Sequence, residues 1–547
     1  MVSAKSFKAI PIRTKTLSSS TFYQPLSREF LKFWGLEAML PRLVARLPLA
    51  RHYGLCMRKF SSEATTTQKI SLILSTKTPK QVVIEALHKH FDRLPRKSIN
   101  TLDGGAAIFA SPSFATWLRD DSFIEGLLGT LFDLGNHENS KCESLDALCA
   151  VTDGLTPKTL FSEPQTGFSI LYGPTKNLLP GLWDLDSYQS VSDQDIESSV
   201  SFLSSPLPKD TRPLEITLPL ANTVFHTGSR TTLFASHWQR DRLGNLAHSQ
   251  TSTKLTQRIC PDINLADHTR PLLPFLPLIP PRRIVAGLGN IVRQVEVDGS
   301  PTPASKELES LVPRIFDIRS KRDVSYSPGP IGVWCWILPP HVVEKYNLLN
   351  LKVFEAESPQ SEAELTLQSM NMFSELISSG CRLHKILSGG GGWGLKQGLL
   401  SLDPETQFSL PNQDDQHDIE MFIRAFKDIG NPNPSEGLVT PGSYIMFCIE
   451  PHLTEKEIGA SRQMAPMTAL GVAPSGDQEP DSASQSNDIE IIDNHFGVVS
   501  KAGLFLKATT LSHMDNSSAS KSAEQPQVFT TKIDSPRASF LLYGPQI

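Results

Sequence analysis

The stretch KISLILS at residues 69–75, followed by TPKQVVIEALHKHFDRL at 78–94, decides the class of fold that this chain predicts. The first stretch is rich in apolar and β-branched side chains, which is typical of a strand. In the second, Thr78-Pro79 is typical of a helix start, with Thr78 as the cap. The helix is predicted to bury the apolar residues that follow at helical spacing, which are Val83, Leu87, Phe91 and Leu94. A strand followed at once by an amphipathic helix opens an α/β layered domain.

The same alternation continues downstream to residue 175. Three further stretches predict strands, at Ala106–Ala110, Leu145–Val151 and Phe168–Tyr172. Between the first two, Ser122 and Glu125 have the spacing of a capping box, and an apolar stripe at helical spacing follows. We therefore expect an N-terminal α/β domain over residues 66–175.

The amino-acid composition and the predicted secondary structure change after residue 175. Residues 176–212 are acidic and Ser-rich and predict a linker or insertion. Residues 213–345 predict a β-rich domain whose expected strands are Leu214–Leu220, Asn222–His226, Thr231–Ser236, Ile284–Gly289, Ile291–Val297 and Gly332–Leu338. Gly228-Ser229-Arg230 is predicted to be a hairpin turn. Trp334 and Trp336 alternate with Cys335, so a strand would place both indoles on one face.

The C-terminal part, residues 355–547, predicts an α+β domain. Its best helix begins at the capping box Ser361/Glu364, carries a stripe of Leu367, Met370, Phe373 and Ile377, and ends at Gly380. Late strands are expected at Tyr444–Ile449, Ile489–Ile492, Gly497–Ser500 and Leu504–Lys507. Residues 464–487 and 512–527, rich in Ser, Gly, Asp, Pro and Gln, are expected to be disordered insertions. The expected fold class is α+β: an α/β layered domain followed by a β-rich region with a glycine-rich loop.

The residues before the deciding stretch form a cationic leader. Residues 1–60 contain eleven Lys and Arg but only two acids, Glu29 and Glu37, which is the composition of a mitochondrial transit peptide. The leader ends in Arg58-Lys59-Phe60-Ser61, which resembles the matrix-processing pattern of Arg, any residue, an aromatic and a small residue. We expect a soluble matrix protein. A basic tail that binds nucleic acid or anionic lipid is the alternative, and Met39 could be the true start.

The charge of the remaining chain limits its partners. Without residues 1–60 it has 41 basic and 55 acidic residues, a formal charge of −14, so binding of nucleic acid over the whole surface is not expected. The sequence has no apolar run of 18 residues, so no transmembrane segment is expected. Its seven scattered cysteines and fourteen histidines show no metal-ligand spacing, and the sequence names no cofactor.

A glycine-rich tract is the main candidate for a ligand site. It comprises Gly389, Gly390, Gly391, Gly392, Trp393, Gly394 and Lys396. Consecutive glycines let the backbone approach a ligand and present its N–H groups to an anion, Trp393 offers an apolar face, and Lys396 adds a positive charge. The residues around the tract do not complete a dinucleotide or P-loop motif. A flexible hinge or tight loop is the alternative interpretation.

Three arginines form a second candidate site. Arg282, Arg283 and Arg293 surround a predicted strand–turn–strand and could bind an anion or an RNA backbone, although pairing with surface acids is the alternative. The catalytic residues are unknown, because His384, Asp403, Glu405, Asp493 and His495 could each transfer a proton but belong to no motif.

Two functions therefore stay open. The first is a non-catalytic accessory factor in organelle biogenesis or gene expression, acting through protein or ribonucleoprotein contacts. The second is a matrix enzyme or binding protein that holds a phosphorylated small molecule at residues 389–394.

Overall fold

The chain divides into two compact units, Met1–Glu63 and Ala64–Ile547. The first unit contains the predicted leader and lies outside the described residues. The computed structural model describes residues 67–93, 102–133, 142–157, 159, 161–184, 197–203, 214–241, 245–261, 269–324, 326–354, 360–389, 398–409, 438–454, 457, 468–474, 489–511 and 526–542. All of them belong to the second unit, and their fold is α+β as expected, with helices packed on several sheets.

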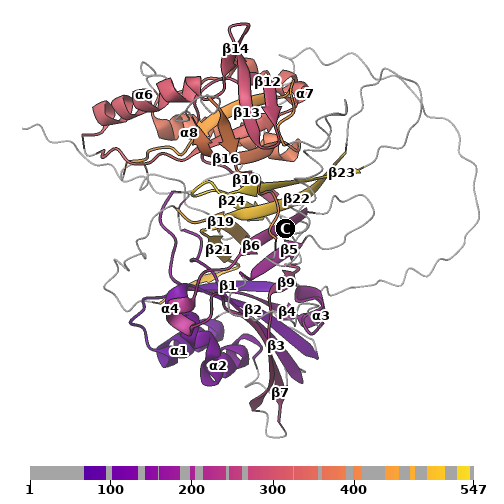
Figure 1. The fold of residues 1–547 in the computed structure, drawn as a ribbon. Coiled ribbons are helices and arrows are strands. Elements are labelled where there is room, and N and C mark those ends of the chain that lie inside the picture. Colours follow the sequence, from indigo (N-terminus) through magenta and orange to yellow (C-terminus); the bar gives the residue numbers. More distant parts are fainter. Residues whose placement is uncertain are drawn as a thin grey trace, which may run out of the picture. The chain divides into compact units, whose positions relative to one another are not determined.

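The stretch that begins at residue 69 lies inside a seven-stranded mixed sheet (Figure 1). In spatial order its strands are β20 (Glu490–Asp493), β1 (Gln68–Ile73), β4 (Gly167–Pro174), β2 (Asp103–Ala110), β3 (Ser144–Val151), β7 (Leu233–Arg240) and β8 (Leu246–Thr253). Only β2 and β3 pair in parallel among these neighbours. The predicted domain 66–175 thus supplies β1 to β4, while the other three strands come from far downstream.

Helices cover one face of this sheet. They are α1 (Lys80–Asp92), the 3-10 helix η2 (Pro112–Arg119) and α2 (Asp121–Leu131), and their apolar sides share one core with alternate residues of β1 to β4. The two predicted caps are wrong. The Asp120 side chain accepts the N–H groups of Ser122 and Phe123, so α2 begins before Ser122. Pro79 is the cap residue of α1, and the Thr78 hydroxyl is buried without a hydrogen-bond partner.

A second, eight-stranded sheet closes on itself, because β15 pairs with β18 as well as with β16. Its strands are β11 (Leu276–Pro277), β18 (Tyr444–Ile449), β12 (Arg282–Leu288), β13 (Ile291–Val297), β17 (Leu400–Leu402), β16 (Arg382–Gly389), β15 (Val333–Leu338) and β14 (Ser300–Pro303). The helices associated with this barrel are α6 (Lys306–Arg322), α7 (Pro340–Lys345), η3 (Leu348–Asn350) and α8 (Glu362–Ser378).

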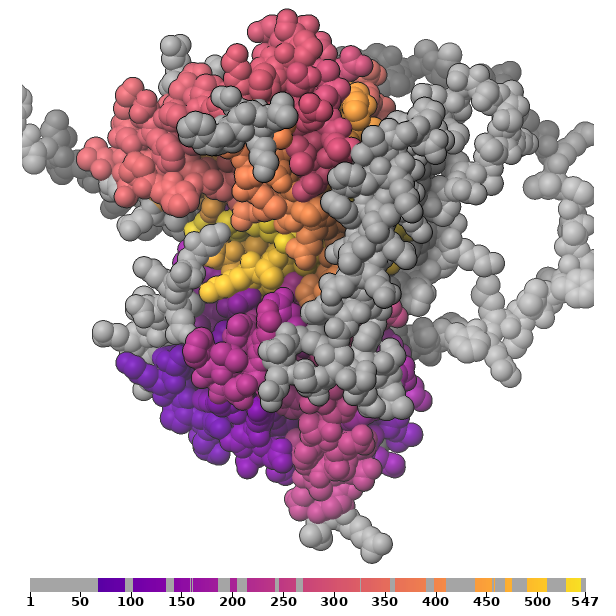
Figure 2. All heavy atoms as spheres, in the orientation of Figure 1, coloured from indigo at the N-terminus to yellow at the C-terminus, as the bar shows by residue number. Residues whose placement is uncertain are grey.

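Two smaller sheets complete the second unit. One is formed by β10 (Thr269–Leu272), β24 (Ser539–Leu542), β19 (Thr468–Val472) and β21 (Phe496–Ser500). The other is formed by β23 (Pro526–Ile533), β22 (Leu504–Leu511), β6 (Leu214–Pro219), β5 (Ser199–Leu203) and β9 (Thr256–Ile259). One apolar core joins residues of all four sheets, and in Figure 2 the late residues, coloured yellow, lie against much earlier segments.

Several predicted loops contain regular structure instead. The strand β5 lies within the predicted linker 176–212, β19 lies within the predicted insertion 464–487, and β23 begins at Pro526, inside 512–527. Residues Ser199 and Val200 are buried, as is all of β19. These short strands are flanked by polar residues in the sequence, so they can be identified only from their pairing with other strands in the structure.

Two helices of the structure are not among the expected elements. The expected strand Asn222–His226 is instead a helical turn, α4 (Val224–Thr227), which ends at Gly228 with φ +76°. The 17-residue helix α6 is the other one; Pro313 lies inside it, although proline normally interrupts a helix. Pro313 faces solvent, which leaves the buried side of the helix, with Leu308 and Ile315, unbroken.

Other expectations are confirmed. Helix α8 begins at the Ser361/Glu364 capping box and buries Met370, Phe373 and Ile377, although Leu367 is half exposed. Trp334 and Trp336 point into the central core, whereas Cys335 points into the barrel core. No helix in the described part of the chain is long and apolar enough to cross a membrane.

Candidate functional site

The glycine-rich tract joins two adjacent barrel strands. Gly389 ends β16 and pairs with Leu400 of β17, while Gly390, Gly391, Gly392, Trp393, Gly394 and Lys396 lie outside the described residues. A Cβ added to Gly389 would lie 2.5 Å from the Leu400 side chain, so glycine here permits close strand packing. At the other end of the tract, Gly398 accepts the N–H of Ser305, the residue before α6. The base of the tract therefore contacts the start of a long helix.

The predicted arginines are only partly available for an anion. Arg282 forms a bidentate ion pair with Glu307, in the first turn of α6, with Nη2 2.8 Å from Oε1. Arg283 lies 3.7 Å from Glu296 and lines, with that carboxylate, an open cleft of about 400 Å³. Arg293 is exposed on β13, and its backbone carbonyl accepts the N–H of Ala304 just before α6. Arg293 alone thus combines an exposed guanidinium with a place beside the base of the tract.

Three of the five predicted proton-transfer residues lie in the barrel or directly after its strand β17. The His384 Nδ1 donates to the Asp403 carbonyl at 2.9 Å, and Nε2 is buried with no hydrogen-bond partner. Burial lowers the pKa of His384 to about 4, against the Asp403 hydrogen bond that raises it. The Asp403 and Glu405 carboxylates both bind the ammonium of Lys532. This arrangement holds neutral imidazole and paired charges in place, which is a structural role.

The other two lie where β1, β4 and β21 meet. The His495 Nδ1 is 2.8 Å from the Ser71 Oγ, which is itself 2.9 Å from the Ser169 Oγ, and burial lowers the pKa of His495 to about 4. Asp493 binds the Nε2 of His90 at 2.8 Å. Ser71 is only 1% exposed and its hydroxyl also donates to the His495 carbonyl. A buried hydroxyl committed to three partners cannot act as a nucleophile, so this network ties strands together.

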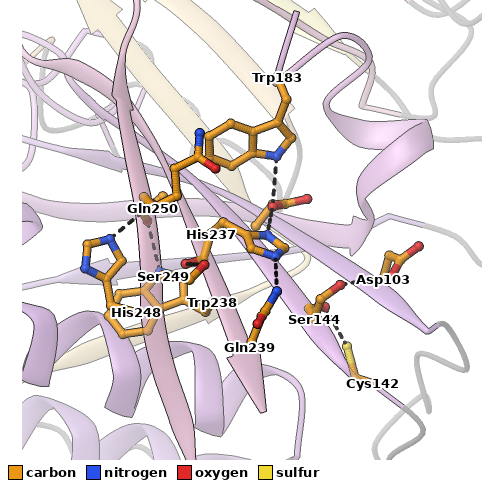
Figure 3. A network of polar contacts seen from close by, with 12 residues as sticks. Asp103, Cys142, Ser144, Trp183, His237, Trp238, Gln239, His248, Ser249 and Gln250 are labelled. Carbon is orange, nitrogen blue, oxygen red and sulfur yellow. Dashed lines mark hydrogen bonds and ion pairs between the residues drawn. The ribbon is translucent and has the colours of Figure 1, made fainter. Parts of the chain in front are cut away.

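His237 on β7, which is not among the predicted site residues, has an imidazole whose orientation is fixed by hydrogen bonds (Figure 3). Its Nδ1 donates to Asp146 on β3 at 2.7 Å, and the Trp183 indole donates to the same carboxylate at 3.0 Å. The amide of Gln239 lies 3.4 Å from Nε2. This places a proton acceptor toward the surface, but among the described residues no hydroxyl or thiol hydrogen-bonds to the His237 ring; the Ser249 hydroxyl donates to the His237 backbone carbonyl instead. In the sequence, Asp146 could have indicated this site, because it is an acidic residue inside the otherwise apolar strand LDALCAV.

The neighbouring edge strand β8 is protected against pairing. Two residues of β8 face one of β7 where the register shifts between His237 and Trp238, which is a β-bulge. On the same strand the His248 Nε2 contacts the Gln250 carbonyl at 3.1 Å and thereby occupies an acceptor. Bulges and blocked backbone groups are devices that prevent strand addition at a sheet edge. The network in Figure 3 is therefore best explained as support for this edge.

Among the described residues, the largest apolar side chain that is exposed to solvent is Phe225, in α4. It is 97% exposed, and Val224 beside it is 43% exposed. We call residues 222–230 the Phe225 turn. Figure 1 shows α4 at the margin of the seven-stranded sheet, near α1, and α4 packs beside η2.

Hydrogen bonds fix the backbone of the Phe225 turn. The Thr223 hydroxyl is buried, donates to the Ser229 carbonyl at 2.9 Å and lies 2.8 Å from the Thr232 hydroxyl. The Asn222 side chain accepts the Val224 N–H at 3.0 Å, which starts the helical turn. Gly228 ends it in the left-handed region, where glycine carries little strain. The apex is thus held in one conformation before any partner binds.

The turn is also anchored to the sheet and binds Arg119 of η2, for which the described residues provide no carboxylate partner. The Val151 carbonyl, at the end of β3, accepts the Ala221 N–H at 3.0 Å. The Arg119 guanidinium donates to the Thr227 carbonyl at 3.4 Å and to the Ser229 hydroxyl at 3.3 Å. These are long bonds to neutral acceptors, so its charge is not balanced by a carboxylate. An exposed aromatic side chain on a turn that also binds an arginine is typical of the residues that dominate protein interfaces.

No family model, curated protein or solved structure matches this chain. Among the described residues, no group of three or more His, Cys, Asp and Glu side chains is placed to hold a metal ion. The interpretation of the site therefore rests on its geometry alone.

Proposed function

We propose that this protein is a non-catalytic accessory factor of the mitochondrial matrix that acts in organelle biogenesis or gene expression through protein contacts made by the Phe225 turn. The exposure of Phe225 carries the proposal: the side chain is almost fully exposed in the fold, so covering it with a partner would contribute about 1.5–3 kcal/mol to binding. The imidazoles of His384, His495 and His237, in contrast, hydrogen-bond to neighbouring residues in networks that stabilise the fold.

The location is supported by two features. The cationic leader has the composition of a transit peptide. The second compact unit begins at Ala64, directly after the processing pattern that ends at Ser61. Cleavage there would leave every described strand and helix intact. We expect the endogenous protein to begin at or just after Ser61; an uncut Met1 terminus in the cytosol would contradict the proposal.

A matched pair of variants tests the contact function. We expect Phe225→Asp to move the protein from a large assembly to free monomer in gradients of gently lysed mitochondria. Val324→Asp is the control, since Val324 is 99% exposed but lies after α6, away from the turn. Equal sedimentation of both variants and of the wild type would reject the Phe225 turn as a contact site.

A phosphorylated-ligand site at the glycine-rich tract is our second proposal. It is supported by exposed Arg293, whose backbone carbonyl accepts the N–H of Ala304, the neighbour of the Ser305 that binds Gly398. The carboxylates Glu307 and Glu309 in the first turn of α6 weigh against it, because they already complement the helix dipole. Thermal-shift titrations with nucleotides and sugar phosphates test it. Unchanged ligand affinities in Gly391→Val and Lys396→Ala variants would end this proposal.

A further inference from the structure

We infer that the partner of the Phe225 turn is a protein that offers an apolar pocket with a carboxylate at its rim, positioned for Arg119. This inference rests on the proposed function and adds the chemistry of the partner. The apolar part follows from Phe225 and Val224, which together present exposed hydrocarbon at the apex. An aromatic side chain needs a desolvated pocket to contribute strongly to affinity.

The carboxylate follows from the charges around the turn. Arg230 is paired with Glu197, and Asp120 is paired with Lys80 while it caps α2. Asp121 lies 3.3 Å from His248. Arg119 is exposed, and within the part of the chain that the structure describes it binds neutral oxygens and no carboxylate, so it supplies a positive charge to the turn.

The Arg119 guanidinium also has more N–H donors than the two hydrogen bonds described above require. It has five N–H groups in a planar fork that matches a carboxylate, and the two contacts it makes within the chain, at 3.3 and 3.4 Å, are long. A partner carboxylate would replace water on the outer side of the fork without breaking a strong internal bond. Arg119 binds the Thr227 carbonyl at the end of α4, the four-residue helix that carries Phe225, so a partner that covers this short helix can reach both side chains.

An RNA is the main competing occupant, since arginine binds phosphate and an aromatic ring stacks on bases. The protein partner is favoured here. The apex pairs Phe225 with aliphatic Val224 rather than with a second ring or a row of cations, and the chain beyond the leader is strongly acidic. Single-stranded nucleic acid is usually held by a positively charged groove.

The experiment uses the full chain in isolated mitochondria with a photoreactive phenylalanine analogue at position 225. We expect a nuclease-resistant adduct to a different polypeptide, whose yield falls severalfold as ionic strength rises from about 0.05 M to about 0.3 M. Arg119→Glu should lower the yield about tenfold, as expected for reversal of a charge at an interface. Arg119→Lys, which keeps the charge but loses the fork, should retain most of it. Thermal unfolding of each variant checks that the fold is unchanged.

The outcomes separate the inference from the proposed function. If position 225 gives no adduct, the contact function itself fails. If position 225 gives an adduct whose yield changes neither with ionic strength nor in the Arg119→Glu variant, the contact function is supported but the inference of a carboxylate at the rim of the partner's pocket is wrong. Release by nuclease would identify an RNA occupant, an adduct of twice the mass of this chain would identify a second copy, and cross-linking to lipid would identify a membrane; each overturns the inference.

Discussion

At the scale of single residues, two buried imidazoles make stability depend on pH. Burial lowers the pKa of both His384 and His495 to about 4, whereas a histidine in an unfolded chain has a pKa near 6.5. Between these values the unfolded state binds more protons than the folded state, so stability falls as the pH is lowered. Above pH 6.5 both groups are neutral in either state and the effect is absent.

This difference predicts a loss of about 3 kcal/mol per histidine when the pH falls from 7 to 4. Denaturant unfolding at pH 7, 5.5 and 4 measures it. The comparison variant is His384→Phe, which removes one titrating group and also the unpartnered Nε2. Its stability should depend less steeply on pH than that of the wild type. Identical pH dependence in the two proteins would show that His384 is protonated without cost in the fold.

Two glycines predict opposite effects of the same change. A Cβ on Gly167, whose φ is +139°, would lie 1.9 Å from the Leu72 carbonyl oxygen, on the paired strand β1. Gly167→Ala should therefore destabilise the protein by more than about 2 kcal/mol. Gly129 lies within helix α2 with no atom near its missing Cβ, so Gly129→Ala should stabilise by about 0.5–1 kcal/mol. Chemical denaturation measures both, and equal signs would contradict the local geometry.

At the scale of elements, a buried ion pair joins α6 to α8. Arg319 and Glu362 are each 6% exposed, and the guanidinium binds the carboxylate at 2.8 and 2.9 Å. The remaining hydrogen-bonding capacity is also used. The Glu450 carbonyl, after β18, accepts from Arg319, and the His452 N–H donates to Glu362. The pair therefore connects both helices to one end of the barrel.

A double-mutant cycle tests what this pair contributes. Arg319→Met leaves a buried carboxylate without its partner and should cost about 3–5 kcal/mol. Adding Glu362→Leu removes that lone charge, so the double variant should recover most of the loss. Unfolding free energies of the four proteins give the coupling. A double variant no more stable than Arg319→Met would mean that the backbone contacts of Glu450 and His452, rather than charge, dominate.

The elements also show where sequence patterns are sufficient. Helix α8 is predictable because its capping box and buried stripe lie within one stretch of chain. Helix α6 is not, because Pro313 indicates a break that its exposed position tolerates. The short strand β19 is identified only by its partners β21 and β24, which are remote in sequence.

At the scale of the whole molecule, distant segments complete one another's sheets. β1 pairs with β20, more than four hundred residues later, and β10 pairs with β24 near the end of the described chain. The sites are built in the same way: Asp146 meets His237 and Trp183 from other segments, and Arg119 meets Ser229. No local sequence pattern indicates contacts between segments that are so far apart in the chain. The sequence therefore predicted a site at the glycine-rich tract, which is a local feature, and did not indicate the Phe225 turn.

This interleaving predicts that the α/β domain expected at 66–175 does not fold alone. Its strands β2 and β3 are buried on both faces, and one of those faces packs against residues of β5, β6 and β21 in the central core. A fragment of residues 61–212 keeps the helices but exposes that apolar face and leaves β3 without β7. It should aggregate or unfold without a cooperative transition, whereas residues 61–547 should unfold cooperatively. Calorimetry and circular dichroism of the fragment and of residues 61–547 distinguish these outcomes, and a sharp thermal transition in the fragment would establish an independent N-terminal domain after all.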